Sequence, residues 1–365
     1  MPPRESFVFK YQYKGVIQMN KQWKRFMAAT FCAAILTGFG SFGVNAAYEL
    51  SAEVKQPTPA LLTATEIGVK VHENTAMQNL QNKDAILITS FGTTFKDTRA
   101  KTIDAVVNKI KKAFPHKEVR VAFTSHIIID RIMKHEGIQY YTPEQAYDNL
   151  KKDGYNRIAI VPFNIIPGIE YDYSVEAANL QQKNFKKIAV ATPVMYYMGQ
   201  EGQPDQINDF LNALKYQLPQ HMQKNEAVLF MAHGTPHPGN AFYSVMQDRL
   251  KMMGMNNAYI YSVEGRPNLD DVIPQLHANK IQKVTLMPIM MVAGDHANND
   301  MAGDEPDSHK MILQKEGFKV NTYIRGLGEN PKIQDLFVER AREAVQALDT
   351  KEAKVPYTPM HSKKH

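Results

Sequence analysis

Short, nearly unbroken apolar runs alternate along the chain with segments whose apolar residues recur every three or four positions. The first run covers residues 84–94, and residues 98–114 follow it with apolar side chains at helical spacing that end at Pro115. Further runs follow at 119–125, 157–166 and 187–192. Runs this short predict strands buried on both faces of a parallel sheet, and the intervening helices predict βαβ units with right-handed crossovers.

The same order of runs begins again in the second part of the chain. Residues 226–235 align without a gap on residues 84–93, and residues 259–263 align on the second run. Residues 283–294 align on 157–168 with Pro288 over Pro162, and 318–324 supply a fourth run. Three matches in order, with one proline and two glycines in common, predict a duplicated α/β domain. The nearly unbroken apolar run from Val284 to Val292 is expected to be one strand.

These patterns divide the chain into five predicted segments. They are an upstream extension with a signal peptide (1–47), a linker (48–82), an N-terminal α/β domain (83–200), a C-terminal α/β domain (201–348) and a disordered tail (349–365). An amphipathic segment at 330–348 is expected to close the second domain as a helix. Residues 83–200 are called the first half below, and residues 201–348 the second half.

The segment from Met19 to Ala47 has the pattern of a secretory signal peptide. Lys21, Lys24 and Arg25 precede an apolar core from Phe26 to Val44, and small residues at 44–47 offer cleavage sites. This order predicts export to the periplasm and no membrane span after cleavage. An uncleaved membrane anchor is the alternative, since the apolar stretch is long enough but is diluted by Gly, Ser and Thr.

Composition and charge narrow the chemistry that the exported part of the chain can perform. Hydrophobic residues make up 44% and charged residues 22%, as in a globular protein. Six basic residues and one acid lie in residues 1–46, so the leader carries +5 of the formal +6. The net charge of the remaining residues is therefore near +1, which gives no indication of a nucleic-acid partner. The only cysteine, Cys32, also lies in the leader, which excludes disulfides, thiolate zinc sites and a cysteine nucleophile from the rest.

Three titratable residues follow three of the predicted strands in the second half, namely His233, Glu264 and His296. The carboxyl ends of parallel strands meet at one edge of a sheet, so these side chains are expected to converge there. Two imidazoles and a carboxylate without a thiolate suit a divalent ion such as Co²⁺, Fe²⁺, Ni²⁺ or Zn²⁺. The alternative is that they are three unrelated polar loop residues.

Motifs around these residues resemble a known family. Met-Ala-His-Gly-Thr at 231–235, Val-Glu-Gly at 263–265 and Gly-Asp-His-Ala-Asn-Asn-Asp at 294–300 resemble the anaerobic-pathway sirohydrochlorin cobaltochelatases, which are class II, ATP-independent chelatases. Motifs at 90–94, 122–125 and 166–171 are similar to the same family, and the resemblance covers residues 84–347. It implies two Rossmann-like domains with parallel sheets that face a central tetrapyrrole cleft.

The resemblance also implies an activity and a set of site residues. It implies insertion of Co²⁺, with Fe²⁺ or Ni²⁺ as alternatives, into sirohydrochlorin in the anaerobic cobalamin pathway. His233, Glu264 and His296 would then be both the metal ligands and the catalytic residues, with His233 as the leading proton acceptor. No nucleotide is expected, because the sequence lacks a Gly-x-x-x-x-Gly-Lys-Ser/Thr motif.

Residues of the first half are expected to bind the tetrapyrrole, which carries eight carboxylates. The candidates are Ser90, Thr93, Thr94, Ser125, Glu170 and Tyr171. Hydroxyls and helix N-terminal amides would bind the carboxylates, and Tyr171 would contact the face of the macrocycle. Because corrinoid synthesis is cytoplasmic, the leader leaves open an alternative function, a periplasmic haem-, tetrapyrrole- or metal-binding protein with the same fold. A homo-oligomer is also left open.

Overall fold

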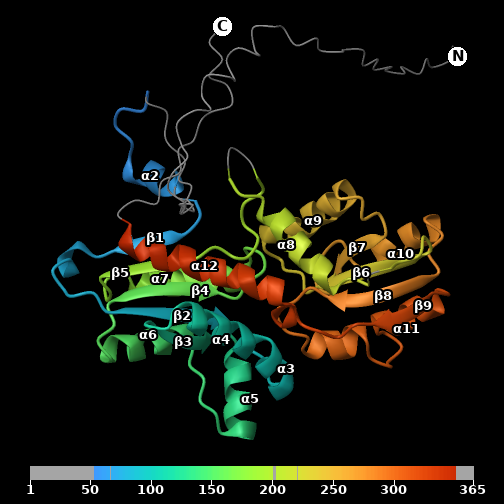
Figure 1. Ribbon diagram of the computed structural model, residues 1–365, viewed down its shortest axis with the longest axis horizontal. Coiled ribbons are helices and arrows are strands. Elements are labelled where there is room, and N and C mark those ends of the chain that lie inside the picture. The colour runs from blue at the N-terminus through green and yellow to red at the C-terminus, as the bar shows by residue number, and fades with distance from the viewer. Residues whose placement is uncertain (1–52, 66, 200–202, 220, 351–365) are drawn as a thin grey trace, which may run out of the picture. The chain divides into compact units, whose positions relative to one another are not determined.

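A computed structural model of the chain describes residues 53–65, 67–199, 203–219 and 221–350 (Figure 1). The predicted signal peptide and the part of the tail beyond residue 350 lie outside these ranges. The described residues form two β-sheets with helices between successive strands, which confirms the predicted α/β class. Within these ranges, no helix is both long enough and apolar enough to cross a membrane.

The first sheet has the strand order β1-β5-β4-β2-β3. Its strands are β1 (Lys70–Glu73), β2 (Asp84–Ser90), β3 (Glu118–Phe123), β4 (Arg157–Pro162) and β5 (Lys187–Val190). β2 to β5 pair in parallel, whereas β1 pairs with β5 in the antiparallel direction. The sheet is therefore parallel except at one edge.

The second sheet has the order β7-β6-β8-β9, and all its pairs are parallel. Its strands are β6 (Glu226–Ala232), β7 (Ala258–Ser262), β8 (Lys283–Pro288) and β9 (Lys319–Thr322). When β6 to β9 are placed over β2 to β5 in chain order, the two sheets have the same strand order. The structure thus confirms the internal duplication that the repeat of apolar runs predicts.

Helices connect the strands in both halves of the chain. Those before residue 200 are α2 (Pro59–Thr65), η1 (Thr75–Met77), α3 (Lys96–Lys101), α4 (Ile103–Ala113), α5 (His126–Glu136), α6 (Pro143–Lys152) and α7 (Ile169–Gln181). Those after it are α8 (Gln206–Leu214), η2 (Lys215–Gln217), η3 (Pro238–Asn240), α9 (Ala241–Met252), α10 (Leu269–Ala278), η4 (Ala297–Met301), α11 (His309–Lys315), η5 (Leu327–Glu329) and α12 (Pro331–Asp349). η4 is a single turn of π-helix.

The duplication extends to an ion pair at the start of each central strand. Asp84 lies opposite Arg157 in the register of β2 and β4, and the Arg157 Nε donates to its carboxylate at 2.7 Å. Glu226 lies opposite Lys283 in the same position of the second sheet, at 2.8 Å. The first pair is the more buried. The side chains of Asp84 and Arg157 are 13% and 10% exposed, whereas those of Glu226 and Lys283 are 21% and 39% exposed. Lys117 adds a second cation at 2.7 Å from Asp84.

The Asp84→Asn substitution is expected to destabilise the fold by about 3 kcal/mol at neutral pH, because it removes the carboxylate that pairs with two partly buried cations and leaves Arg157 with only the more exposed Asp349 carboxylate. Burial raises the pKa of the Asp84 carboxyl, but the hydrogen bonds and charges of Arg157 and Lys117 together outweigh it, so the pKa lies below its ordinary value. A carboxyl with a depressed pKa contributes stability above its unfolded pKa of about 3.9, and this contribution is lost as the pH falls through the folded value.

Urea unfolding of both proteins at pH 7 and at successively lower pH measures this effect. The difference between wild type and Asp84→Asn should shrink as the pH falls below about 4. The matched control is Glu226→Gln, the more exposed counterpart in the second half, which should lose less stability. Equal losses in the two variants would show that burial does not set the strength of these pairs.

Three elements differ from the sequence predictions. The predicted linker 48–82 contains α2 and β1, and β1 covers the edge of β5 that would otherwise expose unpaired backbone groups. The predicted helix 98–114 is interrupted at Thr102, whose side chain packs against Gly326 and Gly328. The strand expected to reach Val292 ends at Pro288. Residues beyond it leave the sheet, and the carbonyls of Met290 and Met291 accept from the N–H groups of residues 327–328. Ile289 and Met291 are apolar because their side chains lie in a buried core cluster.

The last helix, α12, belongs to the second half in sequence but packs on the first sheet, as Figure 1 shows where it crosses β4. The rings of Phe337 and Phe163 lie 4.8 Å apart between their centroids. The Arg157 guanidinium donates to the Leu348 carbonyl at 3.0 Å. The amphipathic helix predicted at 330–348 is confirmed, but its apolar face covers β4 and β5 of the first half. The division of the chain near residue 200 stays a prediction.

Candidate metal centre

Three strand ends of the second sheet bring the predicted trio together. His233 follows β6 directly, Glu264 lies two residues beyond β7, and His296 closes the loop after β8. One ligand atom from each of the three lies within 4.8 Å of the others. The two imidazole rings are nearly perpendicular, with centroids 4.8 Å apart. His233 and Glu264 are exposed and His296 is half-buried, so the group is open to a ligand.

A tight glycine turn sets the positions of His233 and Glu264. Gly234 has a φ of +91°, which favours glycine, and the Glu264 N–H donates to the His233 carbonyl at 2.7 Å. A Cβ on Gly234 would lie 1.9 Å from the Glu264 carbonyl oxygen. The counterpart in the first half, Gly92, also has a φ of +91°. The turn therefore belongs to the repeated fold, whereas the ligand residues belong to one half.

Hydrogen bonds at Nδ1 orient both imidazoles for metal binding through Nε2. The His233 Nδ1 lies 2.9 Å from the Gly234 carbonyl oxygen, and in the tautomer that donates from Nδ1 its Nε2 keeps a free lone pair. The His296 Nδ1 lies 2.5 Å from the Asp300 Oδ2 in the same arrangement. Asp300 lies in η4, four residues after His296. Single π-helical turns occur often at functional sites.

The Asp300→Asn substitution is expected to weaken Co²⁺ binding by roughly 10- to 100-fold, because a carboxylate behind a ligating imidazole fixes its ring and raises its basicity. A titration of the purified protein with Co²⁺ measures the dissociation constant. The matched control is Asp295→Asn in the same loop, since Asp295 accepts from the Asn299 amide at 2.7 Å and the structure shows no bond from it to His296. Equal weakening in both variants would contradict a specific role for Asp300.

The set of ligands suits a metal that the protein binds and then transfers to another molecule. Within the described ranges, the group has three members and no fourth histidine, cysteine, aspartate or glutamate. Three protein ligands leave coordination positions open for water and for an incoming ligand, as in catalytic metal sites, whereas structural sites are closed. Two neutral imidazoles and one carboxylate would also reduce the charge of a divalent ion only in part.

Comparison with known proteins agrees with this geometry. Residues 84–346 match the model of the family described as Cobalt chelatase (CbiK). The chain belongs to the CbiK cobalt chelatase family. The match covers every strand except β1 and all three residues of the trio, so it confirms the resemblance seen in the sequence motifs.

Two relatives of the CbiK chain are named sirohydrochlorin cobaltochelatases. The protein from Salmonella typhimurium is 35% identical over 266 residues, which cover 72% of this chain and 97% of the relative. The protein from Nitratidesulfovibrio vulgaris is 29% identical over 269 residues, covering 73% and 92%. A multi-domain Deinococcus radiodurans protein with structural similarity to chelatases superposes with a TM-score of 0.48 at 12% identity, covering 72% of this chain and 56% of that one.

The substrate-binding residues predicted in the first half of this CbiK chain lie at strand ends, but several already have partners. Ser90 and Thr93 are buried, and Thr94 is half-buried. Thr93 accepts from the Phe95 N–H at 3.2 Å. Ser125 is the N-cap of α5 and accepts from the Ile128 N–H at 3.4 Å. These hydroxyls therefore shape the loops, and their contact with a tetrapyrrole stays a prediction.

Glu170 and Tyr171 occupy the first turn of α7. Glu170 is half-buried and accepts from the Thr124 hydroxyl at 2.6 Å. Tyr171 is only 5% exposed, and its hydroxyl has no hydrogen-bond partner among the residues that the structure describes. Burial raises the pKa of this hydroxyl far above its ordinary value. Tyr171 thus differs from the expectation that it contacts a macrocycle face, because the helix turns its ring inward.

Sequence reasoning missed two polar residues of this region. Asp300 lies in the motif at 294–300 but is not among the predicted site residues, although its spacing of four residues from His296 is the spacing at which side chains meet on a helical turn. Thr124, which donates to Glu170, lies in the motif at 122–125 but is not among the predicted site residues. Its role depends on a contact across 46 residues, which a local pattern does not reveal.

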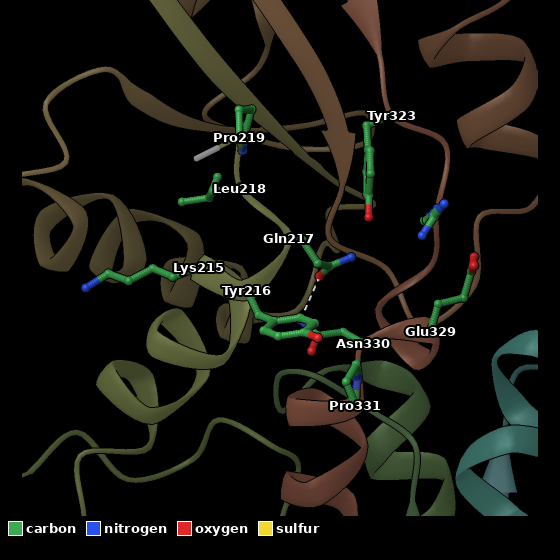
Figure 2. A pocket seen from close by; sticks show the side chains of 10 residues that line it. Lys215, Tyr216, Gln217, Leu218, Pro219, Tyr323, Glu329, Asn330 and Pro331 are labelled. Atoms are coloured by element: carbon green, nitrogen blue, oxygen red, sulfur yellow. Dashed lines mark hydrogen bonds between the residues drawn. The ribbon is translucent and has the colours of Figure 1, made fainter. Parts of the chain in front are cut away.

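A cavity of about 690 Å³ lies elsewhere in the CbiK chain, between η2, the segment after β9 and the start of α12. Figure 2 shows Tyr216, Tyr323 and Glu329 around it. The Asn330 amide donates to Gln217 at 3.0 Å and caps α12 with its carbonyl oxygen. The residues that line this cavity include none of the trio and none of the predicted substrate-binding residues.

Proposed function

We propose that this protein inserts Co²⁺ into sirohydrochlorin. The observation that carries the proposal is the convergence of His233, Glu264 and His296 within 4.8 Å, in a chain of the cobalt chelatase family. The relatives that cover most of this chain are named for the same reaction. The divalent metal and the tetrapyrrole are both substrates, and the protein supplies ligands and proton acceptors.

The chemistry requires two proton transfers. The free macrocycle loses two pyrrole N–H protons as the divalent ion enters, so its four nitrogens replace protein and water ligands while two protons leave. A neutral imidazole can bind a metal and can also accept a proton near neutral pH. We assign His233 as the first proton acceptor, His296 as a metal ligand, and Glu264 as the anionic ligand and second acceptor.

An absorbance assay of the purified protein with sirohydrochlorin and Co²⁺ tests the function. Insertion should be faster than the spontaneous rate, and it should proceed without ATP and Mg²⁺. The same assay with Fe²⁺ and Ni²⁺ ranks the metals that the donor set would accept. A rate equal to the spontaneous one would reject the enzyme, and tight tetrapyrrole binding without insertion would favour the alternative, a tetrapyrrole-binding protein.

We further propose that the protein acts after export. The support is the order of basic residues, apolar core and small residues at 19–47, which is typical of a cleavable signal peptide. The expected product begins near Ala47 or Tyr48 and is recovered from the periplasm. Mass spectrometry of the protein from its own cell tests this, and an intact N-terminus in the cytoplasm would contradict it.

A further inference from the structure

The cavity of about 690 Å³ beside the start of α12 takes no part in the proposed function. Residues 215–219, which follow α8, form one wall, and Tyr323, Arg325 and residues 329–331 form the other. Sites for small organic molecules usually measure about 300 to 1,000 Å³. The cavity is therefore of the size that holds a small organic molecule, and a single inorganic ion would fill only part of it.

Two basic side chains of this lining lack an acidic partner. The Lys215 Nζ donates to the Asn212 side-chain oxygen at 3.2 Å. The Arg325 guanidinium lies over the Tyr323 ring, with 5.4 Å between its central carbon and the ring centroid. Both basic residues are exposed, and neither forms an ion pair with any residue in the described ranges. Two cations without a counter-charge at one cavity attract an anion.

One acidic side chain limits the charge of that anion. Glu329 is half-buried in the wall, and its carboxylate accepts from the Gly326 N–H at 3.2 Å. A ligand with many negative charges, such as a tetrapyrrole with eight carboxylates, would place charge beside Glu329 that the two cations cannot balance. A compound with one or two carboxylates matches Lys215 and Arg325.

Two tyrosines give the cavity flat aromatic surfaces. Tyr216 is 65% exposed, and Tyr323 is half-buried beneath the Arg325 guanidinium. Figure 2 shows the two rings at separate places on the wall, with Gln217 between them. Aromatic side chains pair with flat ring systems through stacked or edge contacts, so the lining suits a ligand with a planar aromatic body.

Hydrogen bonds connect the two walls. The Asn330 amide is 2% exposed and donates to the Ala213 carbonyl at 2.9 Å and to the Gln217 side-chain oxygen at 3.0 Å. Its own side-chain oxygen accepts from the Lys332 N–H at 2.9 Å. The amide thereby links the end of α8 and η2 to the start of α12. Because the walls are already ordered, less free energy is lost to their ordering when a ligand binds.

We propose that this cavity is a second binding site, for a planar aromatic compound that carries one or two carboxylates. Lys215 and Arg325 pair with the carboxylate, and Tyr216 and Tyr323 contact the ring. The lining contains none of the trio, so the site is independent of the metal centre and of the proposed function.

Calorimetric titration of the purified, metal-free protein tests the site with two probes of equal shape. Naphthalene-2-carboxylate carries the negative charge, and naphthalene-2-carboxamide is its neutral counterpart. The variants are Arg325→Gln, Lys215→Gln and Tyr216→Ala. The matched control is Arg342→Gln, because Arg342 also lies over an aromatic ring, at 5.9 Å from the Phe114 centroid, but lines no part of this cavity.

Wild type should bind the carboxylate roughly 10-fold more tightly than the carboxamide, since charge-assisted hydrogen bonds form only with the anion. Arg325→Gln and Lys215→Gln should each raise the dissociation constant of the carboxylate by roughly 5- to 10-fold and leave that of the carboxamide unchanged. Tyr216→Ala should weaken both probes, and Arg342→Gln should bind as wild type. Equal binding of the two probes by wild type, or unchanged carboxylate binding in both charge variants, would overturn the site.

Hydrogen exchange with and without naphthalene-2-carboxylate locates the bound probe. Exchange should slow at residues 215–219 and 323–331 and stay unchanged at 233–235 and 294–300, where His233 and His296 lie. Protection confined to the loops of the trio would place the probe at the metal centre and contradict the inference. The rate of cobalt insertion should be the same in Arg325→Gln as in wild type. The binding measurements decide the site whether or not the protein inserts cobalt.

Discussion

Replacement of either His233 or His296 by alanine is expected to lower the rate of cobalt insertion by roughly 10²- to 10⁴-fold, the usual loss for a group that transfers protons. Each imidazole would also be a metal ligand, so the KM for Co²⁺ should rise as well. The fold should remain intact, because His233 is exposed, His296 is half-buried and neither belongs to a core cluster. Glu264→Gln keeps the size of the side chain and should weaken Co²⁺ binding more than tetrapyrrole binding.

Initial rates against Co²⁺ concentration, with thermal melts of each variant, measure these effects. The matched control is His277→Ala, which removes an exposed imidazole at the end of α10 that pairs with Glu316. Its rate should be close to wild type. Rates near wild type in both His233→Ala and His296→Ala would show that the trio does not catalyse cobalt insertion.

The Gly234→Ala substitution is expected to destabilise the fold by roughly 2 to 4 kcal/mol, the sum of the cost of a left-handed φ and of overpacking. The added Cβ would overlap the Glu264 carbonyl, so the two chain segments that carry His233 and Glu264 must move apart. A misplacement of about 1 Å at a reacting centre can cost about 10²-fold in rate. Stability and activity should therefore fall together.

The control Gly254→Ala separates the cost of the left-handed φ from the cost of overpacking. Gly254 has a φ of +75°, but a Cβ there would meet no atom within 4 Å. This control should lose only about 1 to 2 kcal/mol and keep its rate of insertion. Urea unfolding and initial rates of both variants test the comparison. A Gly234→Ala protein as stable and as active as Gly254→Ala would contradict the close packing of the turn against Glu264.

The parts of the fold that the sequence predicts well are those that depend on local patterns. Eight strands, their order of repetition and the convergence of His233, Glu264 and His296 follow from apolar runs and from the rule that parallel strands end at one edge. The strand β1 was missed because its short stretch, Lys70–Glu73, has no apolar run and forms by pairing with β5. The break at Thr102 depends on Gly326 and Gly328, more than 200 residues away.

The same limit applies at the site. Asp300 lies four residues after His296, so a local sequence pattern is sufficient to predict their contact. The inward orientation of the Tyr171 side chain depends instead on how α7 packs.

The docking of α12 on the first sheet determines the order in which the chain can finish folding. Phe337 and its neighbours on α12 share one buried cluster with Val161 and Phe163 of the first half. α12 is the last described element in chain order, so this face of the first half stays uncovered until α12 has been synthesised. The cluster that α12 shares with the first sheet therefore cannot close while the first half is being made, and it forms only when this helix is available.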